Sequence, residues 1–183
     1  MTLWLVTALV VALPVWGVLI YNRLVRLRNQ ARTAWADIDV QLVRRHDLVP
    51  QLVAAVKGYA GHEKALLEAV TQLRAQALAE KSPARLGEVE SALQQATTRL
   101  LGLQEAYPDL KASANFLALQ RDLVEVENHL QYARRFYNGA VRDYNDAVQR
   151  VPDLAVARTF AFAPGEFYQA ETEQRSSVTV KLP

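Results

Sequence analysis

The side chains best suited to chemistry are three histidines, because the chain contains no cysteine. His129 follows Glu125 by one helical turn, a spacing that would let both reach one metal ion. A di-metal carboxylate bundle also needs Glu-x-x-His on two helices and a glutamate from each of the others, and the sequence lacks that signature. His62 precedes Glu63, but no second histidine follows at the spacing of a zinc protease. His46 lies in a charged run, where it is most simply a solvated or salt-bridged residue. The sequence therefore predicts no metal site.

Motifs of other enzymes and of cofactor sites are missing as well. We find no nucleophile elbow, no phosphate-binding glycine loop and no dinucleotide fingerprint. Tyr137 and Tyr144 are one heptad apart, with Asn138 and Asn145 beside them, and a buried tyrosine hydroxyl needs a partner. At this helical spacing we expect core residues with hydroxyls at the edge of a bundle. The sequence thus indicates no catalytic, cofactor-binding or metal-binding residue, and it predicts a protein that is not an enzyme.

The composition excludes some partners. With 183 residues there is room for one domain with appendages. The formal charge of +2 comes from nearly balanced acids and bases. No basic face with interleaved aromatic residues is present, so we expect no nucleic-acid binding. The lack of cysteine does not select a compartment.

An amino-terminal membrane anchor is the strongest signal of any single segment. The run from Leu3 to Ile20 carries no charge and is just long enough to span a hydrocarbon core of about 30 Å. Trp4 and Tyr21 lie where interfacial aromatic residues are expected. A cleaved signal peptide is the alternative, but no basic side chain precedes the run and no Ala-x-Ala site follows it. We expect residues 1–22 to form an uncleaved transmembrane anchor.

Four arginines follow the anchor at once, whereas the stretch before it has no basic side chain. By the positive-inside rule, the amino terminus faces outward and the rest of the chain lies in the cytoplasm. The same side chains are candidates for contact with anionic lipids, although a topology signal is the simpler interpretation. These residues are Arg23, Arg26, Arg28 and Arg32.

A long helix organises the remainder of the chain. Small and apolar residues recur every three or four positions from Phe116 to Val151, which predicts one continuous helix with partners along its length. The positions of this seam are Phe116, Leu119, Leu123, Val126, Leu130, Ala133, Tyr137, Ala140, Tyr144, Ala147 and Val151. Apolar residues beside it predict a stripe wide enough for a bundle of three or four helices. They are Leu117, Val124, Phe136, Val141 and Val148.

The anchor is predicted to continue as an amphipathic helix that stops at Gly58 to Gly61, with Arg45 as the one charged seam residue. At Pro50 this helix either kinks or gives way to a second helix capped by Asp47. We favour the kink.

Two shorter helical segments lie between the long ones. The first runs from about His62 to Lys81, and Ser82 and Pro83 open the second, whose seam includes Leu86, Val89 and Leu93 and which ends before Pro108. If the chain reverses between them, the fold is an all-α, antiparallel up-and-down four-helix bundle. If Ser82 and Pro83 merely kink one helix, a three-helix rod with an interrupted middle helix results. The short connection favours the four-helix bundle over residues 23–151.

The residues from 152 to 183 differ in character and form an aromatic tail. Its aromatic residues either pack back on the bundle as a lid or form a docking surface for a protein partner. They are Phe160, Phe162, Phe167 and Tyr168. The charged run Arg44, Arg45, His46 and Asp47 is a second candidate contact surface. Val178, Val180 and Leu182 alternate like a strand, but we expect a loosely ordered end.

Several stretches together resemble the LemA family of bacterial membrane proteins. They are the span followed by YNRLVRLRNQ, the helix RRHDLVPQLVAAVKGYAGHE, the run AYPDLKASANFLALQRDLVEVENHLQYARRFYNGAVRDYN, and the tail FAFAPGEFYQAE. The resemblance covers nearly the whole chain but not Leu78 to Glu90. It implies a single amino-terminal span, a small exterior amino terminus and a helical domain similar to four-helix up-and-down folds. It brings no catalytic residues.

Taken together, these features predict a non-enzymatic, membrane-anchored helical bundle at the bacterial inner membrane that binds an unidentified protein partner as a scaffold. A lipid-associated, self-assembling structural protein is the alternative, because heptad seams can also be satisfied between copies of one chain. A helical-bundle metalloenzyme is a remote third hypothesis. We expect no cofactor.

Overall fold

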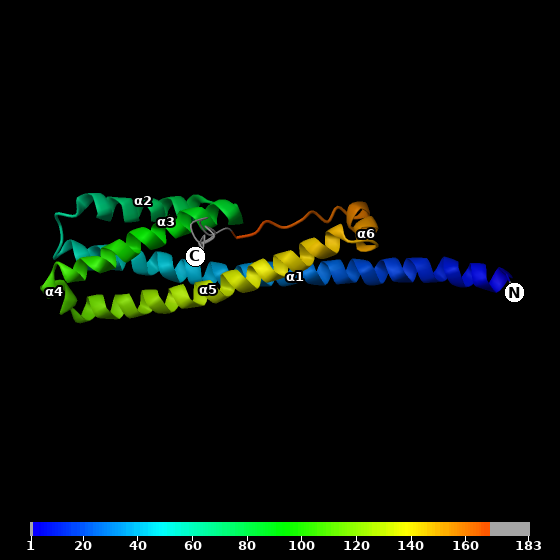
Figure 1. The fold of residues 1–183 in the computed structure, drawn as a ribbon, viewed down its shortest axis with the longest axis horizontal. Helices are drawn as coiled ribbons and strands as arrows, with labels where there is room; N and C mark the ends of the chain where they lie inside the picture. Colours follow the sequence, from blue (N-terminus) through cyan, green and yellow to red (C-terminus); the bar gives the residue numbers. More distant parts are fainter. Residues whose placement is uncertain (1, 169–183) are drawn as a thin grey trace, which may run out of the picture. The chain divides into compact units, whose positions relative to one another are not determined.

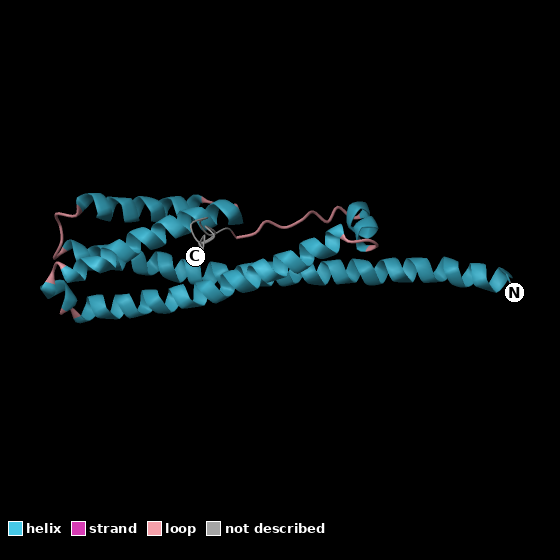
Figure 2. Ribbon diagram, viewed as in Figure 1, coloured by secondary structure: helices cyan, strands magenta, loops and turns pink. Residues whose placement is uncertain are grey.

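The computed structural model describes residues 2–168, and every regular element among them is a helix (Figures 1 and 2). No strand occurs in this part of the chain. The all-α class and the long apolar helix at the amino terminus are therefore confirmed. The end of the predicted tail, including Val178, Val180 and Leu182, lies outside the described residues.

The first helix, α1 (Thr2–Lys57), joins the apolar segment to the amphipathic segment without a break. It passes through Pro50, so the alternative of a second helix starting at Asp47 is wrong. It ends immediately before Gly58, as the glycines predict. One continuous helix therefore carries both the apolar segment and the charged run at residues 44–47.

Helices α2 (Lys64–Ala79) and α3 (Pro83–Gly102) are joined by a short connection. The Glu80 carboxylate accepts hydrogen bonds from the backbone amides of Lys81 and Ser82, both at 2.8 Å. Pro83 occupies the first turn of α3, but the Ser82 side chain makes no capping hydrogen bond. Because α2 packs along α3, the chain reverses here. The alternative of one interrupted middle helix is wrong.

After α3, a 3₁₀ turn, η1 (Leu103–Glu105), and the short helix α4 (Pro108–Lys111) lead into α5 (Ala114–Gln149). Pro108 ends one segment and begins the next, because a missing amide donor costs little in a first turn. The final helix is α6 (Asp153–Thr159).

The predicted seam of α5 is buried along almost its whole length. Nine of its positions are buried, and Ala133 is half-buried. The exception is Val151, which is 77% exposed because it lies beyond the end of α5. Of the flanking residues, Val141 and Val148 are buried, whereas the prediction is wrong for the exposed Leu117, Val124 and Phe136.

The chain forms two compact units. Among the described residues, unit 1 comprises residues 2–40 and Gln131–Phe167, and unit 2 comprises Gln41–Leu130 and Tyr168. Helices α1 and α5 contribute to both units. The expected boundaries after residues 22 and 151 both fall within unit 1 and stay a prediction.

Each unit has its own apolar core. In unit 2, α1, α2, α3, α4 and α5 all contribute, through Val49, Leu52, Val56, Ala60, Leu67, Val70, Leu93, Ala96, Leu100, Leu110, Phe116 and Leu123. In unit 1, the core joins α1 to the end of α5, to α6 and to the third residue after α6, through Ile20, Leu24, Tyr144, Ala147, Val148, Ala157 and Phe162.

Candidate functional site

Unit 2 contains a buried group of charged side chains, Arg45, His46, Glu90 and Glu127, which we call the Glu90 cluster. One oxygen of Glu90 accepts a hydrogen bond from Nη1 of Arg45 at 3.0 Å. Its other oxygen lies 2.6 Å from Nε2 of His46. A second Arg45 nitrogen donates to Glu127. The cluster therefore links α1, α3 and α5.

The electrostatics of the cluster favour an ionised Glu90. Burial raises the pKa of Glu90, but the hydrogen bond from His46 and the charge of Arg45 outweigh it, and the net pKa lies below its ordinary value. An ionised carboxylate only accepts hydrogen bonds, so Nε2 of His46 must carry the proton between them. The backbone carbonyl of His46 accepts from Nε of Arg74 at 2.7 Å, which ties α2 to the same place.

The geometry suits a structural role. Glu90 has no exposed surface, and Arg45 and His46 are each 5% exposed, so a substrate cannot reach them in this conformation. Among the described residues, no group of three or more His, Cys, Asp or Glu could hold a metal ion. A buried, fully paired charge cluster can fix the register of the helices it joins, because any slip leaves a charge unpaired.

The charged run at residues 44–47 does not form one surface. Arg44 and Asp47 are exposed, whereas Arg45 and His46 point into unit 2. Only the two outer residues are therefore available to a partner, and the prediction of a four-residue contact surface is corrected. His46 is buried with its Nε2 2.6 Å from Glu90, and it is not solvated. Arg44 pairs with Glu125 at 2.9 Å on the outside, and the arginine lowers the pKa of that carboxyl.

In unit 1, the extended residues 163–167 after α6 run along α5; we call them the strap. Tyr144 donates its hydroxyl hydrogen to the carbonyl of Ala163 at 2.9 Å, and Tyr137 donates to that of Glu166 at 2.8 Å. Asn145 both donates to the carbonyl of Gly165 and accepts from its amide. The prediction that these tyrosines are core residues with hydroxyls at the edge is confirmed, and the strap supplies their partners.

The aromatic residues of the tail differ in burial. Phe162 and Tyr168 are buried, as a lid requires, whereas Phe160 is 58% and Phe167 41% exposed. Tyr21 meets the rings of both Phe160 and Phe162 edge to face, at centroid distances of 4.9 and 5.5 Å. The tail is therefore partly a lid, with two rings left at the surface.

The four arginines after the apolar segment have different surroundings. Arg23 pairs with the buried Asp153 of α6 at 2.8 Å. The guanidinium of Arg28 lies over the Phe162 ring, 4.9 Å from its centroid. Arg26 and Arg32 are exposed. Two of the four predicted lipid contacts therefore have partners within unit 1, and two face outward.

The apolar segment of α1 is uncovered. Its large side chains from Val10 to Leu19 are about half or more exposed, and burial begins at Ile20. By length and composition, α1 is a candidate membrane span. The packed part of unit 1 thus starts where the uncharged run ends.

Sequence reasoning missed the partners of Arg45. The heptad pattern predicts Val89 for the seam of α3, but Glu90 is the fully buried residue and Val89 is half-buried. A usable signal was present, since an arginine at a seam position requires a buried acid nearby. Asp153, the partner of Arg23, was also missed, and Arg23 is not at a seam position that would have indicated a buried acid.

The described chain is thus an all-helical protein with a long apolar helix at its amino terminus. The model of the LemA family matches residues 34–182, and the chain belongs to that family. A comparison with curated proteins gave no match.

Proposed function

We propose that the protein is a membrane-anchored, non-enzymatic helical protein of the bacterial inner membrane that serves other proteins as a scaffold. In this proposal the apolar segment of α1 spans the bilayer, the amino terminus lies outside, and the helices after the span lie in the cytoplasm. The parts of α1, α2, α3 and α5 that belong to unit 2 then act as an up-and-down four-helix bundle.

The observation that carries the anchor is the exposure of the apolar segment. A water-soluble helix buries its apolar face, whereas Val10, Leu13 and Leu19 are uncovered on different sides of α1. A lipid environment would cover all sides of such a helix. The arginines directly after the segment support a cytoplasmic location for the rest of the chain, because basic residues stay on that side.

A scaffold role is supported by exposed apolar side chains in unit 2. Leu117 and Val124 are one heptad apart on α5, so they share a face, and both are exposed. Glu125, the residue after Val124, pairs with Arg44 and so adds polar groups next to Val124. Apolar residues with a polar rim are typical of protein contact surfaces.

Topology is tested with single cysteines, since the natural chain has none. The H62C variant places a thiol at the exposed turn after α1, and T2C places one at the amino terminus. We expect a membrane-impermeant maleimide to label T2C in intact cells and H62C only after permeabilisation. Labelling of H62C in intact cells would overturn the proposed orientation, and recovery of the chain in the soluble fraction would overturn the anchor.

The scaffold role is tested with a photo-crosslinking amino acid at Val124 in living cells. We expect a defined protein adduct that is absent when the crosslinker is placed in a chain truncated after the anchor. If the Val124 probe yields no adduct beyond those of the truncated control, the proposal that this face binds proteins is wrong.

A further inference from the structure

Helix α6 lies beside α1 at the point where the uncharged run ends (Figure 1). Two contacts fix this position. The ring of Phe160, the residue after α6, is 4.9 Å from the ring of Tyr21, and Asp153 at the start of α6 pairs with Arg23. Both ends of α6 are therefore held against the first three residues after Ile20.

This place coincides with the edge of the proposed membrane span. The polar headgroup region on each side of a bilayer is about 5 to 7 Å thick, the difference between a total of 40 to 45 Å and a core of 30 Å. If Ile20 ends the hydrocarbon core, Tyr21 lies in the headgroup region. A ring 4.9 Å from Tyr21 then lies in or at the border of the same layer.

The side chains exposed here are of the kinds that bind a lipid surface. Phe160 is 58% and Val151 77% exposed, although Phe162, two residues further on, is buried. The exposure of Phe160 therefore does not reflect a generally loose segment. Exposed aromatic and apolar groups at this depth are typical of membrane interfaces.

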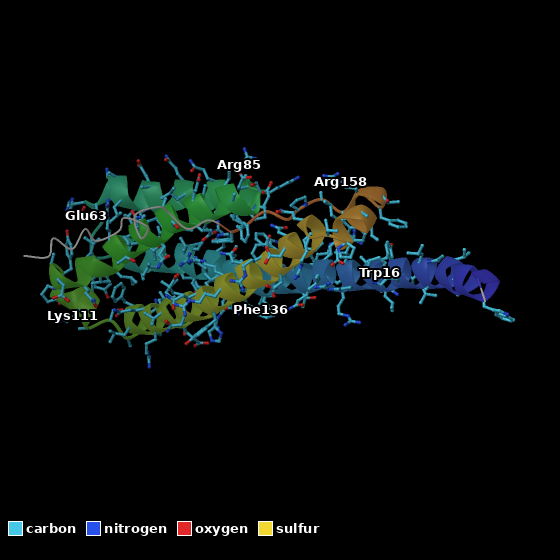
Figure 3. The ribbon with its side chains drawn as sticks, turned by 45° about the vertical axis from the view of Figure 1, so that its right-hand side comes forward. Trp16, Glu63, Arg85, Lys111, Phe136 and Arg158 are labelled. Atoms are coloured by element: carbon cyan, nitrogen blue, oxygen red, sulfur yellow. The ribbon has the colours of Figure 1, made fainter. Side chains whose placement is uncertain are left out.

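The exposed charges of the same segment are all basic. Arg150 and Arg158 are exposed, and Figure 3 shows Arg158 on α6. Asp153 is the one acid between residues 150 and 161, and it is buried and neutralised by Arg23. The exposed part of this segment is thus basic, which favours an anionic surface.

We propose that residues 150–161 form a second membrane contact, in which Phe160 and Val151 enter the headgroup layer of an anionic bilayer and Arg150 and Arg158 face lipid phosphates. This inference rests on the proposed membrane span. Two contacts at one membrane surface, the span and α6, would fix the tilt of unit 1 relative to the bilayer. A single span would leave that tilt free.

The test measures depth in the full chain, reconstituted in vesicles of phosphatidylcholine and phosphatidylglycerol. An environment-sensitive fluorophore is attached at T159C, next to the exposed Phe160. The matched control is R135C, next to the exposed Phe136. Figure 3 shows Phe136 well away from Arg158. Tyr137 contacts Trp35, which is roughly 21 Å along α1 from Tyr21 at 1.5 Å per residue.

We expect nitroxides on the lipid headgroups to quench the T159C label about threefold or more and to leave the R135C label nearly unchanged. The added change Phe160→Ser should reduce the quenching at T159C, and so should Arg150→Gln with Arg158→Gln. Equal quenching at T159C and R135C would overturn the proposal. A T159C label that is shielded from water without lipid quenching would indicate a protein contact or self-association and would also overturn it.

A third label distinguishes a failure of the α6 contact from a failure of the proposed membrane span. V15C lies within the apolar segment, and nitroxides on the acyl chains should quench its label if that segment spans the bilayer. Quenching at V15C without quenching at T159C would refute only the α6 contact. Absence of quenching at V15C would refute the span itself.

Discussion

Replacing Glu90 by leucine removes the central acceptor of the buried charge cluster in unit 2. Glu90 is fully buried and accepts from Arg45 at 3.0 Å and from His46 at 2.6 Å. Hydrogen bonds to charged groups contribute about 1.5 to 3 kcal/mol each, and breaking a buried pair costs about 3 to 5 kcal/mol. Arg45 keeps its second partner, Glu127, so we expect a loss near the lower limit, about 3 kcal/mol.

The assay uses a thiol placed inside unit 2. Ala60 is fully buried in the same core, so the A60C thiol reacts only when unit 2 opens. A loss of about 3 kcal/mol in the free energy of opening raises the labelling rate about 150-fold, at 1.36 kcal/mol per factor of ten. The measurement compares A60C with A60C/E90L in the full chain in detergent micelles.

Two further variants decide whether charge pairing is the cause. The combination Arg45→Met, His46→Leu and Glu90→Leu leaves no fully buried charge unpaired, because the remaining acid, Glu127, is 28% exposed and can be hydrated. We therefore expect it to recover most of the lost stability. Glu125→Ala breaks the exposed pair between α5 and Arg44 of α1, and it should change the rate by less than about threefold. If E90L changes the rate less than fivefold, or if the triple variant is no better than E90L, the reasoning is refuted.

Three further outcomes are expected from the same contacts. The pKa of Glu90 is lowered in the folded state, so its contribution to the free energy of unfolding is complete above the ordinary value of 4.5 and is lost as the pH falls through the folded pKa. A urea titration followed by circular dichroism should therefore show wild type losing more stability between pH 7 and pH 3 than Glu90→Gln. Asn145→Ala removes both hydrogen bonds to the backbone of Gly165, and limited proteolysis should cleave the strap several-fold faster; an unchanged rate would mean that Asn145 does not hold it. Burial raises the pKa of Tyr137 and of Tyr144, so their contribution to stability is complete below pH 10.0 and is lost as the pH rises through the folded values. Protection of the strap against proteolysis should therefore fall above pH 10 in wild type. In the double variant Tyr137→Phe with Tyr144→Phe, that protection should depend less on pH.

The helices were largely predictable because periodicity and end signals are local properties. The seam of α5 gave the buried face from Phe116 to Ala147, and the glycines after Lys57 gave the end of α1. The prediction that Val151 is buried was wrong, because the hydrophobic period does not indicate where a helix stops and α5 ends at Gln149. The prediction that Leu117 is covered was also wrong, because the apolar stripe is wider than the face that the neighbouring helices cover.

The sites were less predictable because they depend on pairing between distant elements. Arg45 at a seam position indicated that an acid should lie near it, but the choice of Glu90 and Glu127 depends on the relative register of α1, α3 and α5. No single-helix pattern contains that register. The spacing of Tyr137 and Tyr144 likewise predicted hydroxyls at the edge of α5. It did not predict that the strap accepts their hydrogen bonds.

The aromatic tail shows why a choice between lid and docking surface could not be made for the whole segment. Phe160 and Phe162 both touch Tyr21, yet the first ring is exposed and the second is buried. Between them, Ala161 has a φ of 53°, which turns the chain at the end of α6 and sends the strap back along α5. The turn therefore separates these two rings: Phe162, after it, packs on the helices, whereas Phe160, at the end of α6, stays beside the proposed membrane surface.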